Sequence, residues 1–172
     1  FTGKPVIIAC ASTALQEQLS GSGGDIDTLS KILGIKIDAR MAKDPRQYIC
    51  DIRVNDFETS NPLDSDVTEW LEQTKTGERS EIPLVSDQIW KQIGWDSSMA
   101  CDKCAHRGFC KLVKARTYYR AAKDLIIADH GVFFEDLWTR DVLLSEDKSP
   151  ILPDYSTVIF DEGHKIMLPA LM

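Results

Sequence analysis

The chain has 172 residues, of which 43% are apolar and 27% are charged, and its formal net charge is −7. This apolar content can bury one core, or one core and a small inserted subdomain, so the composition excludes a disordered chain. The acidic total excludes binding of nucleic acid through overall positive charge, although a local basic groove can coexist with it. No run of about 18 apolar residues occurs, so we expect no segment that spans a membrane.

The first residues lead directly into an apolar run without the charged and apolar regions of a secretory signal. We therefore expect a cytoplasmic protein. The chain starts next to a strand-like run and ends just after a motif of functional appearance. We expect it to be a piece of a longer protein.

The first third of the chain has the order of an α/β protein. Residues 5–10 predict a short strand, and residues 14–19 predict a helix that begins near Ser12 or Thr13. A glycine-rich loop follows at residues 20–24, and apolar residues at helical spacing then predict a second helix that ends at Gly34. The glycine-rich loop lacks the Lys-Ser/Thr pair of a phosphate-binding loop.

From about Asp44 to Gly94 the chain changes in character. This segment is polar, and its prolines and few large apolar residues stand apart from one another: Pro45, Pro62, Pro83, Trp70, Leu71, Leu84 and Trp90. We interpret it as an insertion with little core of its own. Small subdomains of that kind commonly need a bound metal for stability.

The five cysteines divide into one buried candidate and four ligand candidates. Cys10 lies in an apolar run, where a buried structural thiol is expected. Cys101, Cys104 and Cys110 lie close together in a polar, turn-rich stretch, and Cys50 could supply a fourth ligand. An odd number of cysteines, in a protein expected in a reducing compartment, argues against a set of disulfides. The spacing alone leaves zinc, an iron–sulfur cluster and free loop cysteines open.

The last third returns to the α/β order. Residues 112–122 predict a helix, residues 125–128 a buried strand, residues 132–137 a helix and residues 157–160 a last strand. The helix at 112–122 has the densest positive charge of the chain. Its cations and its two tyrosines suit either contact with nucleic acid or a solvated helix whose tyrosines face the core.

Two carboxylates and a histidine directly follow the last strand. If that strand is buried and parallel to its neighbours, Asp161 and Glu162 lie at the carboxyl edge of the sheet, where α/β folds bind ligands. Asp161 would then hold the Mg²⁺ of a nucleotide, Glu162 would orient and deprotonate water, and His164 would couple the site to a neighbouring motif. Alternatively, these residues only end the strand and cap a helix.

These residues also carry a family resemblance. Asp161-Glu162-Gly163-His164 resembles the DEAH box of helicases, with Gly163 where alanine is usual. Residues 11–19 resemble the T-x-x-L-Q-x-Q-L segment of DinG/XPD-type (Rad3-like) iron–sulfur superfamily 2 DNA helicases. Tyr48-Ile49-Cys50, the three later cysteines, Ala115-Arg116 and the A-x-H-x-x-L-x-x-D-L segment at 128–137 follow in the order of that family. Asp129 and Gln47 stand where asparagine is usual, and Phe133-Phe134 replace smaller residues.

The resemblance implies a partial RecA-like P-loop NTPase helicase domain, of α/β class, with an inserted small, mostly helical four-cysteine iron–sulfur subdomain. It implies residues 1–43 and 121–172 for the RecA-like domain and residues 44–120 for the insertion. It also implies a [4Fe–4S] cluster, and Mg²⁺ and ATP in the intact protein. The implied ligands are Cys50, Cys101, Cys104 and Cys110 for the cluster, and Asp161 for Mg²⁺.

For the parent protein, the resemblance implies an ATP-dependent 5′–3′ DNA helicase that translocates on single-stranded DNA and unwinds duplex or forked DNA in repair or replication. The candidates for DNA contact are Thr13, Gln16, Lys114 and Arg116. No G-x-x-x-x-G-K-[ST] occurs in the chain, so we expect it to be inactive alone. A zinc-stapled nucleic-acid or protein binding module without ATPase function is the alternative.

Overall fold

The computed structural model describes residues 3–167 and residue 171. The predicted domain ends at residues 1 and 172 therefore lie outside the described residues. The chain forms two compact units, one of residues 1–43 with 116–172 and one of residues 44–115. That the first is a motor domain and the second an iron–sulfur insertion stays a prediction.

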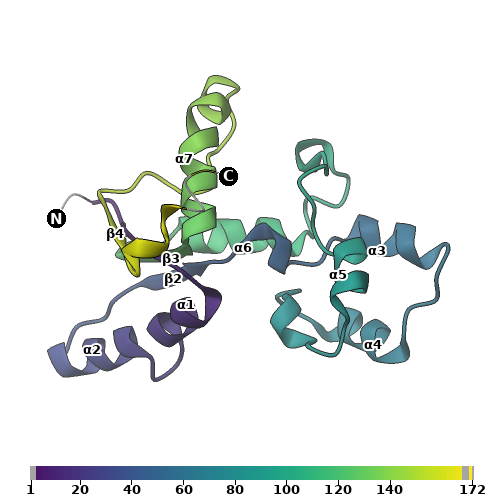
Figure 1. Ribbon diagram of the computed structural model, residues 1–172, viewed down its shortest axis with the longest axis horizontal. Helices are drawn as coiled ribbons and strands as arrows, with labels where there is room; N and C mark the ends of the chain where they lie inside the picture. Colours follow the sequence, from purple (N-terminus) through teal and green to yellow (C-terminus); the bar gives the residue numbers. More distant parts are fainter. Residues whose placement is uncertain (1–2, 168–170, 172) are drawn as a thin grey trace. The chain divides into compact units, whose positions relative to one another are not determined.

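Unit 1 is built on a four-stranded parallel sheet (Figure 1). Its strands are β1 (Val6–Cys10), β2 (Ala39–Ala42), β3 (Leu125–Asp129) and β4 (Thr157–Phe160), in the order β2-β3-β1-β4. Ala9 of β1 lies opposite Ala128 of β3 on one side and Phe160 of β4 on the other. Because all strands are parallel, β1, β3 and β4 end at the same edge of the sheet.

Helices cover both sides of this sheet, with α1 (Thr13–Ser20) on one side and α7 (His130–Ser145) on the other (Figure 1). Ser12 caps α1 by accepting from the Leu15 N–H at 3.4 Å, and Asp129 caps α7 by accepting from the Val132 N–H at 2.7 Å. α2 (Asp25–Leu33) ends at Gly34, which has a left-handed φ of 65°.

The predicted strands and helices of this unit are confirmed, and one strand was not predicted. β2 has the sequence Ala-Arg-Met-Ala, which is too short and too mixed to show an alternating pattern. It forms a strand because β3 offers it a partner along its whole length, from Ala39 opposite Leu125 to Ala42 opposite Ala128.

The core of unit 1 lies between the sheet and α7. The strands contribute small and branched side chains such as Ile7 and Ile126, and α7 contributes Val132, Phe133 and Phe134. The rings of Phe133 and Phe160 meet edge to face, with centroids 5.1 Å apart. This packing holds β4 in place from the α7 side.

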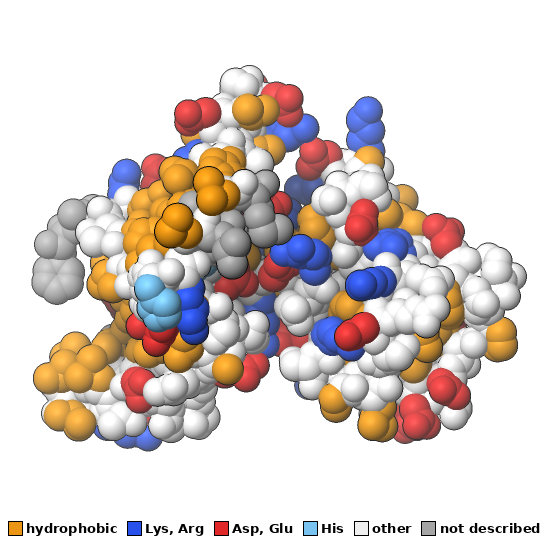
Figure 2. Space-filling view, viewed as in Figure 1, with side chains coloured by type: hydrophobic (Ala, Val, Ile, Leu, Met, Phe, Trp, Pro, Cys, Tyr) orange, Lys and Arg blue, Asp and Glu red, His pale blue; other side chains and the backbone are white. Residues whose placement is uncertain are grey.

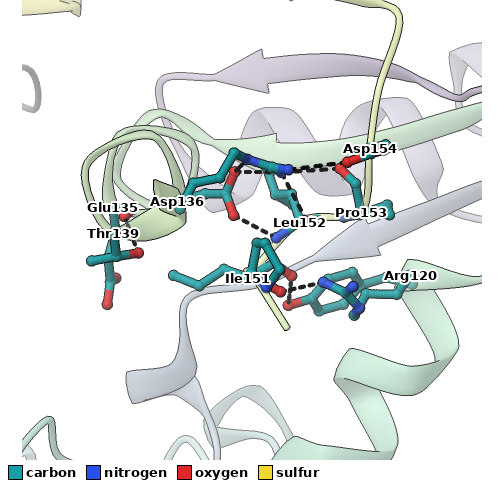
Figure 3. A network of polar contacts seen from close by, with 11 residues as sticks. Arg120, Glu135, Asp136, Thr139, Ile151, Leu152, Pro153 and Asp154 are labelled. Atoms are coloured by element: carbon teal, nitrogen blue, oxygen red, sulfur yellow. Dashed lines mark hydrogen bonds and ion pairs between the residues drawn. The ribbon is translucent and has the colours of Figure 1, made fainter. Parts of the chain in front are cut away.

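A polar network fixes the segment that leads into β4 (Figure 3). Asp136 is 1% exposed and accepts from the Leu152 N–H at 2.8 Å, while Arg140 donates to the same carboxylate at 2.8 Å. Arg140 also donates to the carbonyl oxygens of Leu152 and Pro153. α7 is thus tied to residues 152–153, which precede β4.

β4 is not the buried strand that the sequence predicts. It lies at the end of the sheet, where β1 is its partner among the described strands, and Ile159 is 53% exposed. The apolar run of Val158, Ile159 and Phe160 suggested a buried strand, but only Val158 and Phe160 pack against the core.

Unit 2 consists of short helices: α3 (Asp51–Glu58), α4 (Ser65–Gln73), α5 (Asp87–Ile93) and the 3₁₀ turns η1 (Pro45–Gln47), η2 (Arg79–Glu81) and η3 (Cys101–Lys103). α6 (Lys111–Arg120) begins in this unit and ends in unit 1. Two isolated antiparallel bridges, Tyr48 to Glu78 and Ile49 to Gly94, join its loops.

The expectation that this insertion has little core is wrong. Its helices each bury one or two residues, and together with residues of its loops these form a separate cluster: Ile49, Val54, Val67, Ile82, Val85, Trp90 and Ile93. Leu84, which we expected to anchor the insertion, is 88% exposed. Apolar residues placed singly along polar helices show no clear stripe in the sequence, yet the fold brings them together.

None of the described helices combines the length and the apolar composition that crossing a membrane would require.

Candidate functional site

The carboxyl edge of the sheet brings together the residues that follow three strands. The Asp161 N–H donates to the Ala9 carbonyl oxygen at 2.9 Å. The His130 Nε2 lies 2.9 Å from the carbonyl oxygen of Asp161 and 3.1 Å from that of Ala9. β1, β3 and β4 are therefore joined at the point where the DEAH-like motif begins.

His130 is a site residue to which sequence reasoning gave no role. Both partners of its Nε2 are carbonyl oxygens, which only accept, so Nε2 carries the proton and donates to them. The side chain is 2% exposed, and its Nδ1 is buried without a hydrogen-bond partner among the described residues. The sequence carried two signals for it, its place directly after a buried strand and its match to the histidine of the A-x-H-x-x-L-x-x-D-L segment.

Asp161 and Glu162 are exposed to solvent at this edge. Asp161 Oδ1 accepts from the Glu162 N–H at 2.9 Å. Glu162 has a left-handed φ of 54°, a conformation that is uncommon outside glycine and concentrates at functional sites. Its Oε2 lies 3.3 Å from His164 Nε2 and 3.8 Å from Lys165 Nζ. The structure thus brings Glu162 and His164 together beside Asp161.

Cys10 ends β1 close to these carboxylates. It is fully buried, as the sequence predicts. Burial raises the pKa of its thiol to about 11, and the charges of Asp161 and Asp129 contribute to that rise. Cys10 is therefore an unreactive thiol at neutral pH.

Of the two DNA candidates on α1, Thr13 is half-buried at the first helical position, and Gln16 is 0% exposed. The Gln16 Nε2 donates to the carbonyl oxygens of Ala42 at 3.2 Å and of Ile127 at 3.1 Å. A side chain that joins α1 to two strands from inside offers no surface to a DNA strand. Gln16 therefore stabilises the packing of α1 against the sheet.

Cys50 directly precedes α3 in unit 2. Its N–H donates to the Ile93 carbonyl oxygen at 3.0 Å, which fixes the start of the helix. Burial raises the pKa of its thiol, and the neighbouring Cys101 and Cys110 raise it too, while the N–H groups of Arg53 and Ile52 lower it. Cys101 and Cys110 thus lie close enough to Cys50 to affect its thiol.

The other cysteines lie on the loop that follows α5 and leads to α6. The indole N–H of Trp95 donates to Cys101 Sγ at 3.1 Å, and Arg107 donates to the Cys101 carbonyl oxygen at 3.2 Å. Cys104 and Cys110 are half-buried. Within residues 3–167 and 171, no three or more cysteine, histidine or carboxylate side chains are arranged so that they could hold a metal ion.

The chemistry of these donors nevertheless suits an iron–sulfur cluster. Four thiols from one unit are the ligand set of such clusters, and N–H groups directed at sulfur tune them. Trp95 supplies such a group to Cys101, and the start of α3 supplies two to Cys50. These contacts place hydrogen-bond donors at two of the four thiols.

The cationic residues near the cysteines differ in exposure. Lys114 is exposed, whereas Arg116 is half-buried with its Nε buried. Tyr119 faces the core, and Tyr118 is 61% exposed with the Arg40 guanidinium 4.7 Å from its ring centroid. On the cysteine loop Phe109 is 77% exposed. Sequence reasoning missed Phe109, although an aromatic residue in a polar loop is a recognisable signal.

No protein-family profile matches the chain. The chain is 35% identical over 99% of its length to the probable ATP-dependent helicase YpvA of Bacillus subtilis (strain 168), of which it covers 28%. It is 26% identical over 96% of its length to the ATP-dependent DNA helicase DinG of Photobacterium profundum, of which it covers 26%.

A third relative is the 3′-5′ exonuclease DinG of Bacillus subtilis (strain 168), with 26% identity over 94% of this chain and 17% of that protein. The chain thus spans at most 28% of the length of these three relatives. Over almost its whole length the chain is therefore similar to a segment of two proteins named ATP-dependent helicases and of one named exonuclease DinG.

Proposed function

We propose that this chain is part of an ATP-dependent DNA helicase that moves 5′ to 3′ on single-stranded DNA and unwinds duplex or forked DNA in repair or replication. The observation that carries the proposal is the exposed Asp161-Glu162 pair at the carboxyl edge of a parallel sheet. Its support is the similarity to two proteins named ATP-dependent helicases.

At this edge Asp161 would hold Mg²⁺, directly or through water, and Glu162 would orient and deprotonate the attacking water. Bound Mg²⁺ would neutralise charge on the phosphates of ATP. The His164 imidazole, 3.3 Å from Glu162, would hold that carboxylate in place. Because the phosphate-binding loop is missing from these residues, the chain alone would hydrolyse no ATP.

In unit 2, Cys50, Cys101, Cys104 and Cys110 would hold a [4Fe–4S] cluster. Such a cluster would mainly stabilise the unit, since it would join the start of α3 to the loop before α6. Thr13, Lys114 and Arg116 would contact the DNA backbone, and the exposed Phe109 ring would stack on a base.

The helicase proposal is tested on the full-length protein with Glu162→Gln and Asp161→Asn variants. We expect each variant to lose DNA-stimulated ATP hydrolysis, while Asp141→Asn, an exposed carboxylate on α7, keeps it. Unwinding of duplexes with a 5′ or a 3′ single-stranded tail measures polarity. Preference for the 3′ tail, or full activity of Glu162→Gln, would refute the proposal.

The cluster is tested on this chain by anaerobic absorbance with iron, sulfide and zinc analysis. We expect about four irons per chain and a broad band near about 400 nm. Cys104→Ser should lose both, whereas Cys10→Ser, which alters the buried thiol of unit 1, should keep both. Stoichiometric zinc without a visible band would instead support the zinc-stapled binding module.

A further inference from the structure

Unit 2 contains a groove that has no role in the proposed chemistry. Its volume is about 690 Å³, which lies in the range of ligand sites. Apolar side chains from the end of α3, the loop after it, α4 and the segment before α5 line it: Phe57, Leu63, Val67, Trp70, Ile82 and Val85. None of the four candidate ligand cysteines lines it. The groove is therefore a separate feature of this unit.

An exposed leucine stands at the groove. Leu84 lines it and is 88% exposed, although it is one of the few large apolar residues of a polar segment. A leucine left in water does not gain the favourable free energy of burying its side chain. A single exposed leucine is common, but one that continues an apolar groove extends the surface that a partner can cover.

The charges that line the groove have one sign. Asp64, Asp66 and Glu81 line it, and among the described residues no lysine, arginine or histidine does. Glu81 is held by the indole N–H of Trp70 at 2.9 Å and by the hydroxyl groups of Thr74 and Thr76. Burial alone would raise the pKa of Glu81, but the hydrogen bonds from Thr74, Thr76 and Trp70 hold it below its usual value.

These charges decide which partner fits. Nucleic acid presents phosphates, which the three carboxylates along the groove would repel. An apolar groove with acidic residues instead complements a helix that is apolar on one face and basic beside it. We propose that this groove binds a positively charged amphipathic helix of a partner protein. Its apolar residues, spaced three and four apart, would enter between Trp70 and Leu84, and its lysines or arginines would meet Asp64 and Asp66.

Another apolar surface of the chain provides a comparison. α2 exposes Leu29, Ile32 and Leu33, and Ile35, two residues after its end, is exposed as well. Figure 2 shows hydrophobic side chains gathered over α2 at the lower left. Ile32 is 75% exposed, close to the exposure of Leu84. These residues line neither of the two described pockets, so this surface serves as the control for apolar attraction alone.

The test measures binding of a fluorescently labelled leucine–lysine amphipathic peptide to the whole chain by anisotropy. A leucine–glutamate peptide of the same pattern is the charge-reversed probe. We expect the lysine peptide to bind one to one, more weakly as salt is raised, and the glutamate peptide to fail. Leu84→Ser should weaken binding about tenfold, and Asp66→Lys about fivefold.

Matched controls separate this groove from general attraction. Ile32→Ser removes another highly exposed apolar residue, from unit 1, and Glu58→Lys reverses an exposed charge of α3 outside the groove. Both should bind as the unaltered chain does. If Ile32→Ser weakens binding and Leu84→Ser does not, or if the two peptides bind equally or not at all, the proposal is overturned. Because Leu84 is exposed, circular dichroism should show an unchanged fold for its variant.

Discussion

The Nε2–H of His130 donates to the carbonyl oxygen of Asp161 at 2.9 Å, and so connects the first residue of α7 to the first residue of the DEAH-like motif. The same proton also faces the Ala9 carbonyl oxygen at 3.1 Å. One buried imidazole therefore holds three parallel strands together where the candidate nucleotide site lies.

Replacement of His130 by phenylalanine keeps an aromatic ring at this position but removes the Nε2–H donor. The carbonyl oxygens of Ala9 and Asp161 then lose a partner, and we expect the free energy of unfolding to fall by about 1–3 kcal/mol. Urea unfolding measures this, with exposed His106→Phe as the control. Hydrogen exchange should also accelerate at the Asp161 amide, which bonds to Ala9. Unchanged exchange there would contradict a positioning role.

Replacement of Asp136 by asparagine should destabilise unit 1 by about 2–3 kcal/mol. It removes the charge that pairs with Arg140 in a site where the Asp136 side chain is 1% exposed and that of Arg140 is 16% exposed. Thermal unfolding by circular dichroism measures the loss, and Asp141→Asn on the exposed side of α7 should change little.

A double variant shows whether the loss comes from an unpaired charge. If it does, Arg140→Met should cost clearly less in the Asp136→Asn background than in the unaltered chain. Equal costs in the two backgrounds would show that Asp136 and Arg140 act independently.

Alkaline pH should destabilise the chain in part through Cys10. Burial raises the pKa of this thiol from 9.0 to about 11, so above pH 9 the unfolded chain releases the proton first and the free energy of unfolding falls until about pH 11. The free energy of unfolding should fall by about 1.4 kcal/mol per pH unit at most, the limit for one proton.

Cys10→Ala removes this contribution, while Cys50 and Tyr119, whose pKa values burial also raises, keep theirs. Urea unfolding of both chains at steps between pH 8 and about pH 11 should therefore show a steeper fall for the unaltered chain. Parallel curves would mean that the Cys10 thiol has an ordinary pKa in the folded chain.

Replacement of Glu162 by glycine should stabilise the chain by about 0.5–1 kcal/mol, because glycine adopts the left-handed φ of 54° without the strain of a side chain. Asp147, with a φ of 55° in an exposed loop, provides the matched control, and Asp147→Gly should stabilise similarly. In the full-length protein only Glu162→Gly should abolish ATP hydrolysis. A loss of stability on Glu162→Gly would show that its side chain holds the turn.

Much of unit 1 could be predicted from the sequence because its signals are local. Residues 6–10 and 125–128 are runs of apolar residues with polar residues soon after, and Ser12 and Asp129 are cap residues before helices. Asp161 and Glu162 were likewise found as carboxylates that follow an apolar strand. Their roles in binding Mg²⁺ and activating water stay predictions.

Three features depended on residues that are far apart in the sequence. β2 forms because β3 pairs with it, although its own four residues carry no strand pattern. The core of unit 2 joins single residues from α3, α4 and α5. Gln16 shows the converse case, since its family motif suggested DNA contact while the carbonyl oxygens of Ala42 and Ile127 hold it inside.

By itself, then, the sequence determined the α/β order, the buried Cys10 and the carboxylates after the last strand, since periodicity, caps and strand ends are properties of neighbouring residues. Only the tertiary structure decided that His130 joins three strands, that β4 pairs with β1 and exposes Ile159, and that an acidic groove lies beside Leu84. These three features depend on contacts between residues that are far apart in the sequence. Such contacts, rather than a local pattern, decide which groups are buried and which form hydrogen bonds.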